Sequence, residues 1–204
     1  LLLHHKAPHR TWMPDTCDLG IYDNKTFPLP ANFYDNYEGR TAAAQQEMSI
    51  INDMDEVYDL KMADKENEVR TNSADLESAG RNMYNRMNPD QKAAWDKYYD
   101  PIIKDFKEKK RTGKELAEWK YQRYMHDYLN VIHSVDRNIG VVLKYLEDNN
   151  LLENTLIVYT SDQGFYMGEH GWFDKRFMYE ESFRTPLFMR LPGGKKGTVN
   201  QLVQ

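Results

Sequence analysis

The chain has 204 residues, of which 40% are hydrophobic and 29% charged, and its formal net charge is -5. These fractions are typical of a globular protein and exclude a disordered one, while the acidic balance argues against a nucleic-acid partner. No apolar run approaches the roughly 20 residues that a membrane-spanning helix needs, so no membrane span is expected. The single cysteine, Cys17, excludes an internal disulfide and a zinc site built from several cysteines.

The first forty residues predict the end of a strand and then a long irregular segment. Leu1–Leu3 is apolar and is typical of a buried strand end, whereas the proline-containing stretch after it favours a loop. Residues 15–40 are rich in Pro, Asn, Asp and Tyr, which indicates an ordered but irregular path over a surface. The absence of an initiator Met and the apolar-polar alternation that breaks off at the end indicate a piece of a larger protein.

Two helices are predicted in the middle of the chain. Good helix formers and apolar residues at helical spacing predict the first over residues 41–70. The second runs from about Lys114 to Asp148 and carries one apolar stripe. This stripe consists of Tyr121, Tyr124, Met125, Tyr128, Leu129, Ile132, Val135, Ile139, Val142, Leu143 and Leu146.

Two strands are predicted in the last quarter. Leu156–Thr160 is apolar and β-branched, which favours a buried strand, and Pro186–Leu191 is a second candidate. The segment 161–184 between them contains several glycines and predicts a loop. Because a long helix followed by an apolar strand is half of a βαβ unit, the sequence predicts an α/β fold.

Polar residues follow both apolar runs at the points where ligands bind in open α/β sheets, beyond the carboxyl ends of strands. Ser161–Gly164 follows one strand and His5–Arg10 follows the Leu1–Leu3 run, so both loops are expected to converge on one site. The Asp162 carboxylate and the Gln163 amide are hard oxygen ligands that suit Ca²⁺ or Mg²⁺. An ordinary turn after a strand has the same composition, and on these four residues alone the turn is the favoured interpretation.

The loop Gly168–Arg176 brings two acids, a histidine and two cations together. Lys175 in such a loop can hold an anionic substrate, although an isolated surface lysine is the commoner explanation. His9 can act as a general acid or bind an anion, and its alternative is a hydrogen bond to a backbone carbonyl. No GxSxG, Walker, HExxH or GxGxxG motif is present.

In combination these motifs resemble the C-terminal half of the type I, formylglycine-dependent sulfatases of the alkaline-phosphatase-like superfamily. The matching segments are Thr160–Gly164, Gly168–Gly171 with Lys175, Lys6–Arg10 and the helical stretch Ser134–Gly140. The pattern looks most like the bacterial polysaccharide-degrading sulfatases, similar to heparan-type glucosamine-6-sulfatases. The resemblance implies a partial α/β sulfatase domain with a mostly parallel sheet flanked by helices. Residues 1–204 would form the middle to C-terminal part of the catalytic domain, truncated at both ends.

The resemblance also implies an activity, the removal of sulfate from a sulfated sugar or glycosaminoglycan by a hydrated formylglycine. It implies that Asp162 and Gln163 are calcium ligands and that His9 and Lys175 are catalytic residues. Lys6 and His170 would bind the substrate. Lys175 and the calcium ion would stabilise the charged transition state, and His9 would protonate the leaving alcohol. A periplasmic or secreted location follows from the resemblance alone.

The sequence departs from the family pattern at the nucleophile, which needs a C/S-x-P-x-R motif. Cys17 is followed by Asp-Leu-Gly-Ile and is not that residue, and the acidic pair that completes the calcium site is also missing. Two ligands cannot make a Ca²⁺ site of about 6–8 oxygens, so we expect the isolated chain to be inactive. The formylglycine and the other ligands are expected outside this chain.

Two alternatives stay open beside the sulfatase hypothesis. A zinc phosphatase or phosphodiesterase of the same superfamily is one, although an amide oxygen such as that of Gln163 is a poor zinc ligand. The other is a non-catalytic relative that binds sulfated glycans and has lost its nucleophile. The coexistence of His9, Asp162, Gln163 and Lys175 speaks against this loss, because a decayed site is expected to have lost some of them.

Overall fold

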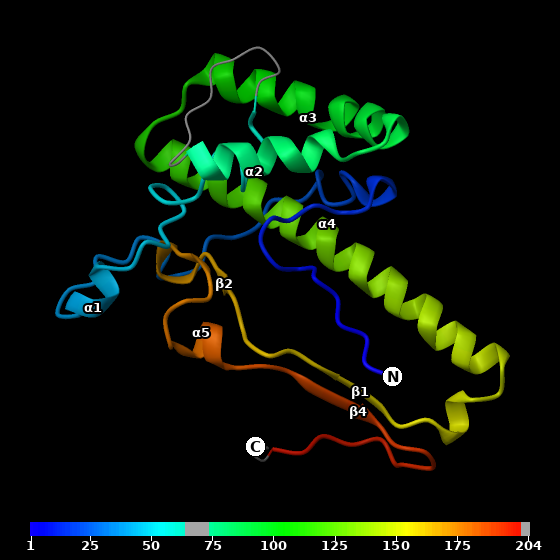
Figure 1. Cartoon of the computed structure of the whole chain (residues 1–204). Coiled ribbons are helices and arrows are strands. Elements are labelled where there is room, and N and C mark those ends of the chain that lie inside the picture. The colour runs from blue at the N-terminus through cyan, green and yellow to red at the C-terminus, as the bar shows by residue number, and fades with distance from the viewer. Residues whose placement is uncertain (64–73, 201–204) are drawn as a thin grey trace.

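The computed structural model describes residues 1–63 and 74–200, which form α-helices, short 3-10 helices and two small sheets joined by long irregular segments. The elements in chain order are η1 (Thr16–Asp18), α1 (Thr41–Ala44), α2 (Ala74–Asn85), α3 (Pro89–Lys109), α4 (Gly113–Asp148), η2 (Leu152–Asn154), β1 (Ile157–Thr160), β2 (Tyr166–Met167), η3 (Glu169–Gly171), β3 (Phe173–Asp174), α5 (Glu180–Phe183) and β4 (Leu187–Arg190). Figure 1 shows α4 as the longest element, with α2 and α3 at its N-terminal end and the β1–β4 ribbon toward its C-terminal end.

The predicted helix at Lys114–Asp148 is confirmed, since α4 runs from Gly113 to Asp148. The preceding helix α3 begins at a capping box. The Asn88 side-chain oxygen accepts from the backbone amide of Gln91 at 2.8 Å, and the Gln91 side-chain oxygen accepts from the backbone amide of Asn88 at 3.0 Å. Pro89 at the first helical position removes an amide that would have no partner. Local sequence therefore determines where α3 begins, whereas Thr112 at the start of α4 makes no side-chain capping hydrogen bond.

The predicted helix over residues 41–70 is wrong for its described part, because only the four residues of α1 are helical there and turns with short irregular stretches follow from 45 to 63. The Asp55 carboxylate accepts from the amides of Val57 and Tyr58 at 2.9 and 2.7 Å, and the Asp53 carboxylate accepts from the Ser49 amide at 2.7 Å. These side chains satisfy amides that a helix would otherwise pair, which favours turns. Residues 64–70 of this prediction lie outside the described residues.

The two predicted strands are confirmed as β1 and β4, but their pairing and burial differ from expectation. β1 pairs antiparallel with β4, with Ile157 opposite Arg190 and Thr160 opposite Leu187, and β2 and β3 are also antiparallel. A mostly parallel sheet is therefore absent from the part of the chain that the structure describes. Leu1–Leu3 forms no strand there either, and its three side chains are exposed.

The β1–β4 ribbon is exposed on both faces, contrary to the expectation of a buried strand. The exposed fractions of Val158, Tyr159 and Phe188 are 50%, 47% and 63%. Val141 and Tyr145 on the C-terminal half of α4 are also exposed. Because a two-stranded ribbon is only marginally stable alone, these elements need a covering layer that the described residues do not supply.

The core lies between the N-terminal half of α4, α3 and the turns at 50–62, and the N-terminal loops add Trp12 and Phe33 to it. Trp12, Tyr99 and Tyr124 are completely buried there, and the Trp12 and Tyr124 ring centroids are 4.5 Å apart. Phe173 of the β2–β3 hairpin belongs to the same cluster. The N-terminal loops and this hairpin therefore share one rigid support. None of the described helices is both long and apolar enough to cross a membrane.

Candidate functional site

The loop after β1 carries several oxygen atoms that could bind a cation, and its carboxylate is not paired with a cation in the described ranges. Asp162 is exposed and forms no ion pair with any residue in the described ranges. The Ser161 hydroxyl donates to the Gln163 carbonyl at 2.8 Å and lies 3.5 Å from the Asp162 carboxylate. Carboxylate, hydroxyl and amide oxygens are hard ligands, so the donor set at this loop fits Ca²⁺ and suits zinc poorly.

The direction of this loop is fixed by its contact with α5. The Gly164 amide donates to the Ser182 carbonyl at 2.8 Å, and a Cβ at position 164 would lie 2.1 Å from the Glu181 carbonyl oxygen. Backbone atoms approach so closely that only glycine fits. The candidate calcium ligands are therefore held one and two residues before a point where the loop touches α5.

Replacing Gly164 with alanine is expected to destabilise the protein by roughly 1–3 kcal/mol, because the Glu181 carbonyl must move to make room. Thermal unfolding of the complete protein with and without Ca²⁺ measures this effect and the accompanying loss of calcium stabilisation. The matched control is Gly140→Ala in α4, where nothing lies within 4 Å of the added Cβ and a small gain in stability is expected. Equal melting temperatures for the two variants would contradict the prediction.

His170 lies in η3, between β2 and β3, and joins three segments of the chain. Its Nδ1 atom is 2.6 Å from the Asp35 carboxylate and its Nε2 atom is 3.8 Å from the Glu181 carboxylate on α5. The Tyr37 hydroxyl donates to the His170 carbonyl. The Arg40 guanidinium, and after it the His170 ring, hold the pKa of the Asp35 carboxyl well below its usual range. Both ring nitrogens of His170 face carboxylates of the protein and not an open surface. Substrate binding by His170 therefore stays a prediction.

Lys175 leaves the hairpin directly after β3, where it is partly exposed. The two residues before it are buried: Phe173 is 1% exposed and its amide donates to the Met48 carbonyl, and Asp174 is 2% exposed and pairs with Arg176 at 3.0 Å. Lys175 itself has no ion-pair partner in residues 1–63 and 75–200. A fixed backbone and an uncompensated ammonium group suit the binding of an anion.

His9 and Lys6 lie in one exposed turn, in which the His9 amide donates to the Lys6 carbonyl at 3.0 Å. The His9 Nδ1 atom is 2.6 Å from the Arg10 carbonyl oxygen. Because a carbonyl oxygen only accepts, the hydrogen-bond network assigns the proton to Nδ1 and leaves Nε2 available for proton transfer. His9 can therefore bond to a backbone carbonyl through Nδ1 and still take part in catalysis through Nε2.

The His5–Arg10 loop contacts the β2–β3 hairpin directly, whereas the Ser161–Gly164 loop is connected to the hairpin region through α5. The Arg10 guanidinium lies over the Phe173 ring at 5.1 Å, and Glu181 on the helix that touches Gly164 faces His170. Their convergence on one site stays a prediction.

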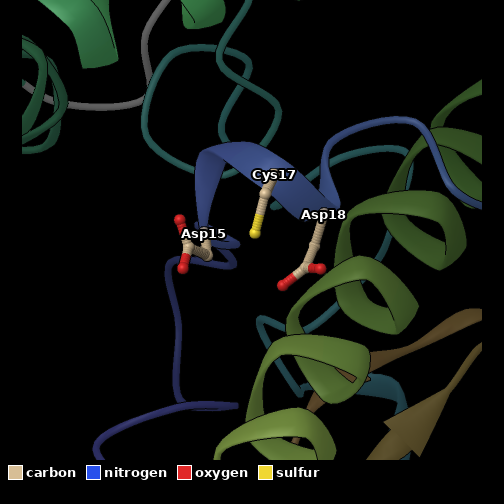
Figure 2. A group of neighbouring side chains, drawn as sticks. All are labelled: Asp15, Cys17 and Asp18. Atoms are coloured by element: carbon tan, nitrogen blue, oxygen red, sulfur yellow. The ribbon is translucent and has the colours of Figure 1, made fainter.

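A second group of potential metal ligands, which the sequence analysis did not single out, lies at η1. The ligand atoms of Asp15, Cys17 and Asp18 are within 4.8 Å of one another, and Figure 2 shows the three side chains around this short helix. The Arg137 guanidinium is 2.7 Å from Asp15 and 2.9 Å from Asp18, and the Ser134 hydroxyl also donates to Asp18. The two carboxylates are thus already balanced by a cation of the protein.

Comparisons with known proteins identify the family of the chain. A family model described as Sulfatase matches residues 1–204. The N-acetylglucosamine-6-O-sulfatase of Bacteroides thetaiotaomicron is 49% identical over 193 residues, which are 94% of this chain and 34% of that protein. The iduronate 2-sulfatase of Mus musculus is 34% identical over 95 residues, 47% of this chain and 15% of that protein.

A solved structure gives the same result. The structure of BT4656 in complex with its substrate D-glucosamine-2-N,6-O-disulfate matches with a TM-score of 0.84 and 49% identity, covering 95% of this chain and 38% of that chain. The chain thus spans about a third of the length of the curated relative from Bacteroides thetaiotaomicron. The predicted α/β class and the resemblance drawn from the motifs are confirmed, and the chain belongs to the sulfatase family.

Proposed function

We propose that this chain forms part of the active site of a sulfuric ester hydrolase that removes sulfate from a sulfated glucosamine or a glycosaminoglycan. The observation that carries the proposal is 49% identity to an N-acetylglucosamine-6-O-sulfatase over 94% of the chain. Because the chain spans about a third of that relative, the formylglycine nucleophile and the remaining metal ligands would come from residues outside these 204. A periplasmic or secreted location is part of the proposal, since such polysaccharides lie outside the cell.

Asp162 and Gln163 would hold the calcium ion. Their oxygens are hard ligands, the carboxylate is exposed, and no positive group of the described residues competes for it. When bound, the ion would orient the sulfate group and offset its negative charge.

Lys175 and His9 would act on the sulfate ester itself. The Lys175 ammonium group would pair with a sulfate oxygen and stabilise the charge that develops there. As the bond between sulfur and the bridging oxygen breaks, a protonated His9 would give the Nε2 proton to the leaving alcohol oxygen. Lys6, three residues before His9 and exposed, and His170 would contact the substrate.

Sulfate release by the complete protein that contains this chain tests the proposal. We expect release from N-acetylglucosamine 6-sulfate that a calcium chelator abolishes and that Ca²⁺, but not Zn²⁺, restores. Faster hydrolysis of glucosamine 6-phosphate, restored by Zn²⁺, would favour the phosphatase alternative instead. Binding of the sulfated sugar without turnover would favour the non-catalytic alternative, and residues 1–204 alone are expected to be inactive.

A further inference from the structure

Arg10 makes contacts that the proposed reaction does not use directly. Its Nε and Nη2 atoms lie 2.5 and 2.6 Å from the two carboxylate oxygens of Asp59, which is the paired geometry that a guanidinium gives with a carboxylate. The Asp59 side chain is 0% exposed and that of Arg10 is 12% exposed. Asp59 is itself held, because it accepts from the Asp55 amide at 2.8 Å. Arg10 is therefore anchored to a part of the chain 49 residues away.

The same guanidinium lies between two aromatic rings. Its carbon atom is 5.3 Å from the centre of the Tyr58 ring and 5.1 Å from the centre of the Phe173 ring. Phe173 is two residues before Lys175, and the Asp174 carboxylate between them is among the charges that raise the pKa of Arg10 against the opposing effect of burial. The Arg10 side chain thus links the His9 loop to β3, the strand that Lys175 directly follows.

The backbone of Arg10 completes the arrangement. Its carbonyl oxygen is the partner of His9 Nδ1 at 2.6 Å and so determines which ring nitrogen stays available. A side chain with paired hydrogen bonds and two ring contacts fixes the backbone to which it is attached. The position of this carbonyl, and with it the tilt of the His9 ring, follows from the Arg10–Asp59 pair.

We propose that Arg10 is a positioning residue for His9, and this inference rests on the sulfatase function proposed above. The ion pair with Asp59 and the contact with Phe173 hold the Arg10 carbonyl where it orients His9 toward the leaving alcohol. A lysine at position 10 would keep the positive charge but would lose the planar fork, so it cannot reproduce the paired contact. The alternative is an ion pair that only stabilises the fold.

The choice of leaving group separates the two roles. The alcohol of a sugar sulfate leaves poorly and needs a proton, whereas the phenol of an activated aryl sulfate such as 4-nitrophenyl sulfate leaves without one. In the complete protein, Arg10→Lys is expected to lower kcat/KM for N-acetylglucosamine 6-sulfate by about 10–100-fold, as part of the roughly 10²–10⁴-fold that a general acid supplies. The expected decrease with the aryl sulfate is less than about threefold.

His9→Ala is the reference for this pattern, and adding Arg10→Lys to it is expected to lower kcat/KM no further, since both changes remove one function. Asp59→Asn is a second variant that preserves volume and weakens the same pair, and it is expected to show the same dependence on the leaving group. It keeps the test decisive if Arg10→Lys does not fold.

The matched control is Arg111→Lys. Arg111 is 8% exposed, pairs with Asp105 at 2.7 Å and lies 5.4 Å from the centre of the Trp119 ring, so it loses comparable contacts at another place. The activity of the Arg111→Lys protein on both substrates is expected to stay unchanged. Equal losses with the two substrates for Arg10→Lys and Asp59→Asn would overturn the inference while leaving the sulfatase function intact. A wild-type protein that releases no sulfate would instead overturn the proposed function, and the inference with it.

Discussion

Replacing Lys175 with alanine in the complete protein is expected to lower kcat for a sulfated sugar by about 10²–10³-fold, the cost typical of removing one group that stabilises transition-state charge. Lys175 follows two buried residues of the β2–β3 hairpin, Phe173 and Asp174, so its backbone cannot shift to let another cation take its place. It also has no ion-pair partner in the described part of the chain, which leaves its charge available for sulfate. Initial rates of sulfate release measure the effect.

Two controls decide what a loss of rate means. Lys175→Arg keeps the charge and is expected to retain more activity than Lys175→Ala. Lys104→Ala removes a lysine whose side chain is 74% exposed on α3 and is expected to leave the rate unchanged. A Lys175→Ala protein with wild-type kcat would show that this residue takes no part in the reaction.

Replacing Asp162 with alanine in the complete protein is expected to weaken calcium binding by at least about 10–100-fold, because this is the usual cost of changing a residue that only supports a metal ligand. The exposed Asp162 carboxylate would lose its charge at the site, while the oxygens of Ser161 and Gln163 would remain. Calorimetric titration with Ca²⁺ gives the affinity, and the calcium concentration needed for half-maximal sulfate release gives a second measure.

The pattern of rescue distinguishes a ligand from a structural residue. High calcium concentrations are expected to restore part of the activity of Asp162→Asn, which keeps one oxygen ligand, and less of that of Asp162→Ala. Asp136→Ala removes an exposed carboxylate from α4 and is expected to leave the calcium affinity unchanged. Unaltered calcium affinity in Asp162→Ala would remove this residue from the proposed metal site.

Local sequence patterns were sufficient for the elements that do not depend on distant partners. The apolar stripe at helical spacing predicted α4 to within one residue at its start, because side chains three and four apart share one face whatever they pack on. The capping box at Asn88 was the signal for α3, which the sequence analysis did not specify. The motifs around Asp162 and Lys175 predicted the family, since their combination is specific even though each is weak alone.

Burial of the strands could not be read from their composition. Leu156–Thr160 and Pro186–Leu191 have the apolar residues of buried strands, yet the β1–β4 ribbon is exposed in this chain. An apolar pattern indicates that a strand is suited to burial. Whether another layer covers the strand depends on other segments. The same reason explains why a parallel sheet was expected but antiparallel pairs were found. Which strands pair is set by long-range topology rather than by the strands themselves.

The sequence by itself determined the family, the long helix α4, the two strand positions and the residue types available for calcium and sulfate. Only the tertiary structure decided which residues support them. Arg10 and Asp59 are 49 positions apart and His170 and Asp35 are 135 apart, so no local spacing relates them. Turns replaced the expected helix after α1 because carboxylates such as Asp55 bind nearby amides, and the buried core then brings the His9 loop and the hairpin together. Such contacts arise from the packing of the whole chain, which is why they become visible only in three dimensions.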